Sequence, residues 1–190
     1  MYEIIHTKAI IFLERREKEY DKVFFIFSEV LGLTSVTAPG ILKPMAKLNS
    51  LLQPFRIVTA DVVVGKSTKK ITTVIDHHSF EKLLTHHETK RSLLRVFEFI
   101  TVMVPRNIPI PEIYTLFESY IRTLEGVSDI QKIRQLETST LYTILKILGY
   151  VSTEDIHFST SQETFLAEHQ PHMHKELLHR VNALLKEIQT

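Results

Sequence analysis

The chain has 190 residues, of which 44% are hydrophobic, and it contains no cysteine. This length supports one or two small domains with modest cores, and the missing cysteines exclude disulfides, thiolate zinc sites, cysteine nucleophiles and iron–sulfur clusters. The formal net charge of +1 names no partner, but residues 1–80 carry 11 Lys and Arg against 8 Asp and Glu, a balance of +3. Any anion-binding surface is therefore expected in the first half of the chain.

The start of the chain, Met-Tyr-Glu, lacks the charged residues and apolar core of a signal peptide. No window reaches the roughly 18 apolar residues of a membrane span. The absence of cysteine suits a reducing compartment. We therefore expect a soluble cytoplasmic protein with no membrane partner.

Five short segments rich in Ile, Val and Phe predict β-strands in the first half of the chain. They cover residues 4–13, 23–27, 33–38, 55–64 and 71–75. Five such strands joined by turns predict a small barrel of the OB type, and an SH3-like barrel fits the pattern nearly as well. The stretch 39–55 is the longest connection between them, and connections of this length in a small β domain are more often functional than idle.

Apolar residues recur at helical spacing from Phe80 onward. Pro105 is expected to end the first helix, a second covers 113–124, and a third is opened by a capping box of Ser128 and Gln131 and ended by Gly149. Residues 151–169 are predicted to form a loop, and Pro171 to begin a last amphipathic helix. The predicted fold is α+β, with a five-stranded OB-like β-barrel in residues 1–79 and a helical domain in residues 80–190.

No catalytic motif is present. The five glycines form no phosphate-binding loop, and no carboxylate pair stands out as an acid–base couple. The ten histidines are expected to be surface and cap residues. The alternative, a metal-dependent enzyme using His169, His172 and His174, would need three rings to converge at a helix start. We therefore expect no enzyme activity, no cofactor and no metal.

Basic residues in the barrel half are the stronger lead, because OB barrels bind nucleic acids through a basic groove and stacking aromatic side chains. Phe12, Phe25 and Phe55 could stack, although most phenylalanines in strands are core residues. Lys43 and Lys47 would share one face if their stretch were helical. The candidate DNA-binding residues lie in the predicted strands and loops: Lys8, Arg15, Arg16, Lys43, Lys47, Arg56, Lys66, Lys69 and Lys70.

Four motifs follow one another in order at 27–33, 38–44, 51–55 and 145–150: Phe-Ser-Glu-Val-Leu-Gly-Leu, Ala-Pro-Gly-Ile-Leu-Lys-Pro, Leu-Leu-Gln-Pro-Phe and Leu-Lys-Ile-Leu-Gly-Tyr. With this order and spacing, residues 4–150 resemble the bacterial RecO family of recombination mediators. The resemblance implies an OB fold followed by a helical domain. It also implies a non-catalytic, nucleoid-associated bacterial protein of DNA repair and recombination.

As partners, the resemblance implies single- and double-stranded DNA, whose strands such proteins anneal, a RecR-like partner, the C-terminal tail of single-strand-binding protein and, indirectly, RecA. Two features depart from the family pattern. The four-cysteine zinc module that many members carry after the Leu-Gly-Tyr helix is missing, and the loop after Gly40 keeps only Lys43 and Lys47. The alternative is therefore a protein-interaction scaffold of the repair machinery with little direct DNA binding.

Overall fold

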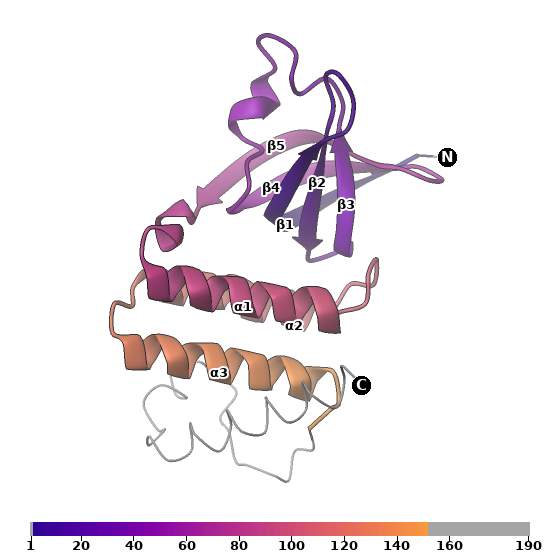
Figure 1. Ribbon diagram of the computed structural model, residues 1–190. Coiled ribbons are helices and arrows are strands. Elements are labelled where there is room, and N and C mark those ends of the chain that lie inside the picture. Colours follow the sequence, from indigo (N-terminus) through magenta and orange to yellow (C-terminus); the bar gives the residue numbers. More distant parts are fainter. Residues whose placement is uncertain (1, 152–190) are drawn as a thin grey trace. The chain divides into compact units, whose positions relative to one another are not determined.

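The structure, a computed structural model, describes residues 2–151 of the chain (Figure 1). Five strands come first and three helices follow: β1 (Glu3–Arg16), β2 (Lys22–Ser28), β3 (Gly32–Ala38), β4 (Arg56–Val64), β5 (Lys69–Ser79), α1 (His87–Met103), α2 (Pro111–Glu125) and α3 (Ile130–Ile147). Two 3-10 helices, η1 (Lys47–Ser50) and η2 (Glu81–Leu84), lie in the connections. The predicted loop at 151–169 and the helix from Pro171 fall almost entirely outside the described residues.

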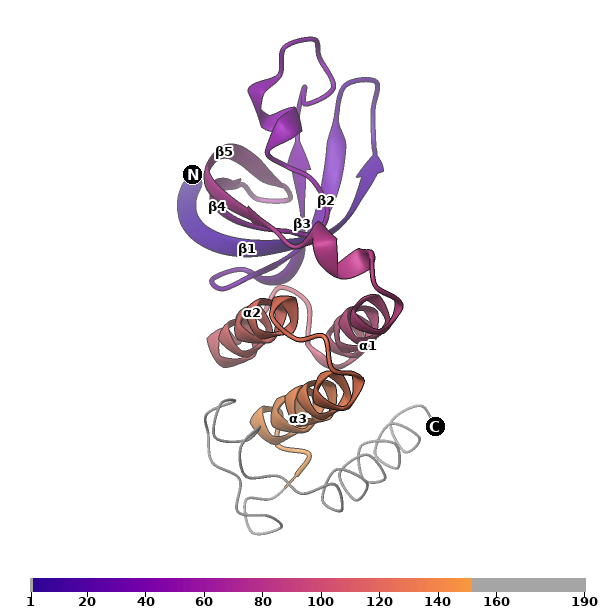
Figure 2. The same cartoon turned by 90° about the vertical axis from the view of Figure 1, so that its left-hand side faces the viewer.

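The strands close into a barrel in the order β1-β2-β3-β5-β4. Neighbouring strands are antiparallel except β3 and β5, which run parallel where Thr37 pairs with Lys70. This topology confirms the α+β prediction with an OB-like barrel. Since β5 occupies the place beside β3, the chain must cross the end of the barrel to begin β4 (Figure 2), which explains why the connection at 39–55 is long.

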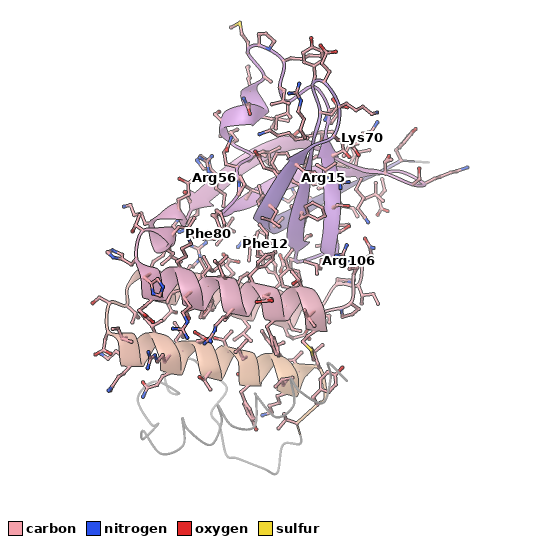
Figure 3. The ribbon with its side chains drawn as sticks, in the orientation of Figure 1. Phe12, Arg15, Arg56, Lys70, Phe80 and Arg106 are labelled. Atoms are coloured by element: carbon pink, nitrogen blue, oxygen red, sulfur yellow. The ribbon has the colours of Figure 1, made fainter. Side chains whose placement is uncertain are left out.

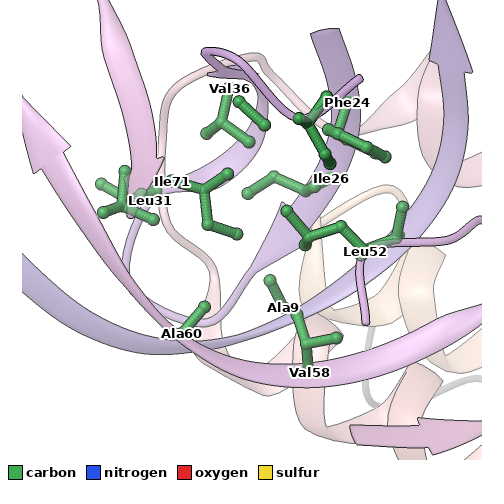
Figure 4. Close-up of a cluster of buried hydrophobic side chains, with 13 residues drawn as sticks. Ala9, Phe24, Ile26, Leu31, Val36, Leu52, Val58, Ala60 and Ile71 are labelled. Atoms are coloured by element: carbon green, nitrogen blue, oxygen red, sulfur yellow. The ribbon is translucent and has the colours of Figure 1, made fainter. Parts of the chain in front are cut away.

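The barrel core is built from the inward-facing side chains of all five strands (Figure 4). Alternation along each strand supplies small residues such as Ala9 and Ala60 and large ones such as Phe24 and Ile26. Two residues of the β3–β4 connection join this core, because Ile41 and Leu52 are 1% and 0% exposed. The connection is therefore anchored at both ends by burial of its own side chains.

The helices divide between two compact units. Residues 2–82 and 101–118 form the first unit, and residues 83–100 and 119–151 form the second. In the first unit, the rings of Phe12 and Phe27 on the barrel pack against Phe117 and Tyr114 of α2, with centroid separations of 5.7 Å in both pairs. The segment 101–118 thus belongs to the same compact unit as the barrel. The division of the chain into domains at residues 79 and 80 stays a prediction from the sequence.

The connector between α1 and α2 is bonded to the barrel through β3. Asn107 N donates to Leu33 O at 3.0 Å, and the Asn107 side-chain oxygen accepts from Thr34 Oγ1 at 2.7 Å. Gly32 allows this approach. A Cβ on it would lie 2.2 Å from the carbonyl oxygen of Ile108, and its φ of +68° lies in the left-handed region. Only glycine combines both conditions without strain.

Several predicted boundaries differ in the structure. β5 extends to Ser79, and α1 begins at His87 rather than Phe80, because residues 81–84 form the separate turn η2. The N-cap of α3 is Asp129, whose carboxylate accepts from Gln131 N and Lys132 N, so the predicted Ser128 cap is wrong. Gly149 is confirmed as the residue after the C-cap. Its φ is +81°, and the bonds Gly149 N to Lys146 O and Tyr150 N to Leu145 O form a Schellman motif.

The second unit contains a buried polar pair between helices. Tyr120 OH lies 2.8 Å from Ser92 Oγ, and burial raises the pKa of Tyr120 well above its ordinary value. Arg95 Nη1 donates to Glu137 Oε1 at 3.2 Å. The bonds satisfy the buried hydroxyls of Tyr120 and Ser92 and the buried carboxylate of Glu137, which would be costly if left without partners. Among the helices of residues 2–151, none is both long and apolar enough to span a bilayer.

Candidate nucleic-acid interface

A row of paired residues crosses the outside of the barrel from β1 to β5. Arg15 pairs with Val23, Val23 with Thr37, and Thr37 with Lys70. Residues that lie directly opposite each other in paired strands point to the same face of a sheet. Arg15 and Lys70, both exposed, therefore lie at opposite ends of one row on the outer surface (Figure 3).

A second row lies beside the first and is less polar. Leu13 pairs with Phe25, and Phe25 with Ser35. Leu13 is 53% exposed, and the guanidinium carbon of Arg15 lies 5.8 Å from the centroid of the half-buried Phe25 ring. This is the range of a cation–π contact. The Arg15 side chain is thus held over an aromatic surface rather than extended freely into solvent.

We call the surface made by these two rows the β2–β3 face. Val23 of the first row is buried, so the face comprises the remaining residues: Leu13, Arg15, Phe25, Ser35, Thr37 and Lys70. The Phe25 ring lies on β2 between the exposed Leu13 of β1 and the hydroxyl-bearing residues of β3. A cation lies at each end of the row from Arg15 to Lys70. Such a surface offers a base a flat apolar contact and offers phosphates charged hydrogen-bond donors. In OB folds, the surface of strands 2 and 3 is a common place for oligonucleotides to bind.

The β3–β4 connection is joined to the β1–β2 loop next to this face. Gly40 N donates to Asp21 Oδ1 at 2.7 Å, and Leu42 N donates to Tyr20 O at 3.0 Å. Lys43 Nζ lies 6.0 Å from the centroid of the Tyr20 ring. Lys43 and Lys47 are both exposed but share no helix, since only turns precede η1, which begins at Lys47. The stretch from Lys43 to Lys47 is therefore not helical, and the condition under which the two lysines would share one face is not met.

Two of the predicted DNA-binding residues, Arg16 and Arg56, bond through their side chains to backbone oxygens of the protein itself. Arg16 donates to the carbonyl oxygens of Lys18 and Glu19 and holds the β1–β2 loop. Arg56, half-buried, donates to the carbonyl oxygens of Ser50 and Leu51 and holds the β3–β4 connection. These hydrogen bonds assign both arginines a part in fixing the loops.

Lys69 has a similar role at the end of the barrel. Its Nζ donates to Asn107 Oδ1 at 2.7 Å and to Thr34 Oγ1 at 3.0 Å. Lys66 is exposed in the turn between β4 and β5. Lys8, also exposed, lies on the outside of β1 opposite Thr59, whose next neighbour is Asp76. A carboxylate nearby makes this part of the barrel less attractive to phosphate than the β2–β3 face.

Lys69→Ala is expected to destabilise the protein, whereas Lys66→Ala is expected to leave stability unchanged. The first removes a charged donor and leaves Asn107 and Thr34 with one bond fewer, a loss of about 1–2 kcal/mol; the second alters a solvated surface residue. Urea unfolding of the two variants and the wild type measures the change in the free energy of unfolding for each variant. Equal midpoints for all three would contradict this role of Lys69.

Of the three phenylalanines considered for stacking, only Phe25 lies on the β2–β3 face. Phe12 is buried against Phe117, and Phe55, with a φ of +61°, packs edge-on against Phe80 at 6.1 Å. Leu13, Ser35 and Thr37 lie on this face but were not among the DNA-binding residues predicted from the sequence. Leu13 is hard to place from the sequence because a β-bulge between Ile11 and Leu13 changes which residues of β1 face outward.

Residues 2–151 contain no group of three or more His, Asp or Glu side chains placed to hold a metal ion. His169, His172 and His174, the histidines weighed as metal ligands, lie outside the described residues.

Comparison with known proteins agrees with the barrel. Residues 1–80 match the family model described as "Recombination protein O N terminal". Two relatives named "DNA repair protein RecO", from two strains of Desulfitobacterium hafniense, DSM 10664 / DCB-2 and Y51, are each 25% identical over 123 residues. The match covers 65% of this chain and 45% of each relative, so the chain spans about half the length of the curated relatives it matches. Residues 1–80 are therefore similar to the N-terminal domain of the RecO family, and the longer match is to proteins named for DNA repair.

Proposed function

We propose that this chain acts in DNA repair and recombination by binding DNA on the β2–β3 face of its barrel. The observation that carries the proposal is the row from Arg15 to Lys70, with the Arg15 guanidinium over the Phe25 ring at 5.8 Å. The names of the two matched relatives, which are DNA repair proteins, support the biological setting. No catalytic step is part of the proposal.

The chemistry of the face suits an unpaired strand better than a closed duplex. Phe25 and Leu13 offer a contact that needs an exposed base, while Arg15 and Lys70 need only phosphates. Duplex DNA would then bind through the cations alone and with lower affinity. A protein with this preference can hold a strand whose bases are free to pair, which is the requirement for strand annealing.

The family resemblance extends the proposal to protein partners: a RecR-like protein, the C-terminal tail of single-strand-binding protein and, through them, RecA. The alternative, a scaffold with little DNA contact, is favoured by one observation. Arg16, Arg56 and Lys69 are bonded within the protein, which reduces the number of cations that could reach phosphates.

Titration of a labelled single-stranded oligonucleotide at stepwise salt concentrations tests the proposal. Fluorescence anisotropy is expected to show binding that weakens steeply with salt, because each phosphate contact contributes about one unit of log–log slope. Phe25→Ala is expected to weaken binding by about tenfold, since stacking of one base contributes about 1–3 kcal/mol. The salt slope of this variant should stay unchanged, because no charge is altered.

A matched control is Phe55→Ala, which removes a phenylalanine outside the face; its affinity for the oligonucleotide should equal that of the wild type. Salt-independent binding, or none at low salt, would contradict the proposal and favour the scaffold. In that case, capture of a RecR-like partner without nucleic acid would support the scaffold directly.

A further inference from the structure

Met45 at the tip of the β3–β4 connection is exposed and conformationally strained. Its side chain is 98% exposed, and its φ is +64°. A residue with a long side chain and no local hydrogen bond seldom adopts this left-handed conformation, which glycine or asparagine adopts at lower cost. The positive φ belongs to the β-turn from Lys43 to Ala46, which Ala46 N closes by donating to Lys43 O, with Pro44 at its second position. A methionine in place of the favoured glycine or asparagine makes this turn more costly, and strain of this kind is often found at functional sites.

The loop that carries Met45 is fixed at its base. Ile41 and Leu52 are buried in the barrel core, and Arg56 donates to the carbonyl oxygens of Ser50 and Leu51. Nearer the tip, Lys43 N donates to Gly40 O and Ala46 N donates to Lys43 O, both at 3.1 Å. The methionine is thus presented by a turn with an anchored base, so little backbone entropy is lost when the loop meets a partner.

The surroundings of Met45 indicate what the partner is made of. Lys43 and Lys47, two residues away on either side, are both exposed. The connection leaves β3 at Ala38, the residue after Thr37 of the β2–β3 face. A ligand that meets this tip must offer an apolar gap with anions on both sides. A step between stacked bases has this chemistry, and nucleic-acid-binding proteins insert methionine and other apolar side chains at such steps.

We propose that Met45 inserts between bases where duplex DNA meets a single strand lying on the β2–β3 face. The inference rests on the proposed function. It gives the loop tip an apolar contact with bases, in addition to the phosphate contacts that its lysines could make. A junction is the favoured ligand, because its last base step is already stacked on one side only and costs least to open. Lys43 and Lys47 would contact the phosphates on either side of the opened step.

The test uses a hairpin DNA with a single-stranded extension and 2-aminopurine, whose fluorescence rises on unstacking, at the last paired position. Wild-type protein is expected to raise the fluorescence. Met45→Gly is expected to bind this junction about tenfold more weakly, the change expected when a partly buried methionine side chain is lost, and to raise no fluorescence. Met45→Leu, which keeps an apolar side chain of similar size, should behave like the wild type.

Met45→Gly also separates function from folding. Glycine adopts the required φ without strain, so its melting temperature is expected to equal or exceed that of the wild type. Equal junction affinity and equal fluorescence for Met45→Gly and wild type would overturn the inference. A variant that loses capture of a protein partner while binding the junction normally would assign the tip to protein docking and overturn it as well.

The failure of this inference is distinguishable from failure of the proposed function. If wild-type protein binds the oligonucleotide in a salt-dependent manner but Met45 has no effect, the inference alone is wrong. If wild-type protein binds no DNA at low salt, the proposed function fails and the inference fails with it.

Discussion

Replacing Gly32 with alanine is expected to lower the free energy of unfolding by about 3 kcal/mol or more. The added Cβ would lie 2.2 Å from the Ile108 carbonyl oxygen, in a backbone conformation with a φ of +68°. The left-handed conformation costs an L residue about 1–2 kcal/mol, and overpacking a close contact costs about 1–3 kcal/mol. The contact involves backbone atoms, so no side-chain rotation can relieve it. Urea unfolding followed by circular dichroism measures the change.

Gly126→Ala is the matched control. Its Cβ would meet only the Thr123 carbonyl oxygen at 3.7 Å, an ordinary contact. This variant is expected to be as stable as the wild type or more stable, because alanine reduces the freedom of the unfolded chain. If Gly32→Ala and Gly126→Ala unfold at the same urea concentration, the close approach of residues 106–108 to β3 does not contribute to stability as described.

Reversing both charges at the ends of the β2–β3 face is expected to abolish most DNA affinity. The double variant Arg15→Glu and Lys70→Glu replaces two phosphate contacts with two repulsive carboxylates. Each lost contact weakens binding by about tenfold near 0.1 M salt, so a reduction of about 100-fold or more is expected, with a salt slope lower by about two. Fluorescence anisotropy with a labelled single strand at several salt concentrations gives both quantities.

The control for this double variant changes the net charge by the same amount but alters no residue of the β2–β3 face. Lys90→Glu with Lys132→Glu does so, since both lysines are exposed on helices α1 and α3. Its slope should match that of the wild type, and its affinity should fall only slightly through long-range charge. Equal losses in the two double variants would show that net charge, rather than the β2–β3 face, governs DNA binding. Neither pair is buried, so both proteins should fold normally.

The strands and the end of the last described helix depend mainly on residues that are close together in the sequence. The strands were predictable because Ile, Val and Phe alternate or cluster between turn residues, as in Val23 to Phe27. The C-terminal end of α3 was predictable from Gly149, because a glycine after a helical stretch marks a left-handed cap. The N-cap was assigned one residue early. Ser128 and Asp129 are both good caps, and only the backbone geometry distinguishes them.

The candidate site was less predictable, because its composition depends on which strands are neighbours. Lys69 and Lys70 are adjacent in sequence, yet Lys69 bonds to Asn107 and Thr34 while Lys70 lies beside Thr37 on the outer surface. Because side chains alternate along a strand, the two lysines are expected on opposite faces of the sheet. The alternation does not say which lysine is on the outer face or which residues each one contacts. Asn107 lies 38 residues from Lys69, and no local pattern indicates that they meet.

The sequence by itself determined the class of fold, the family resemblance and the basic first half of the chain, because composition and periodicity are local properties. Only the tertiary structure decided the strand order β1-β2-β3-β5-β4, which brings Arg15 and Lys70 to the ends of one row. It also decided that Arg56 and Lys69 bond to oxygens of the protein itself and that Met45 is exposed in a turn with a positive φ. The physical reason is that exposure and charge environment arise from contacts between segments far apart in the chain, which strand pairing and burial select together.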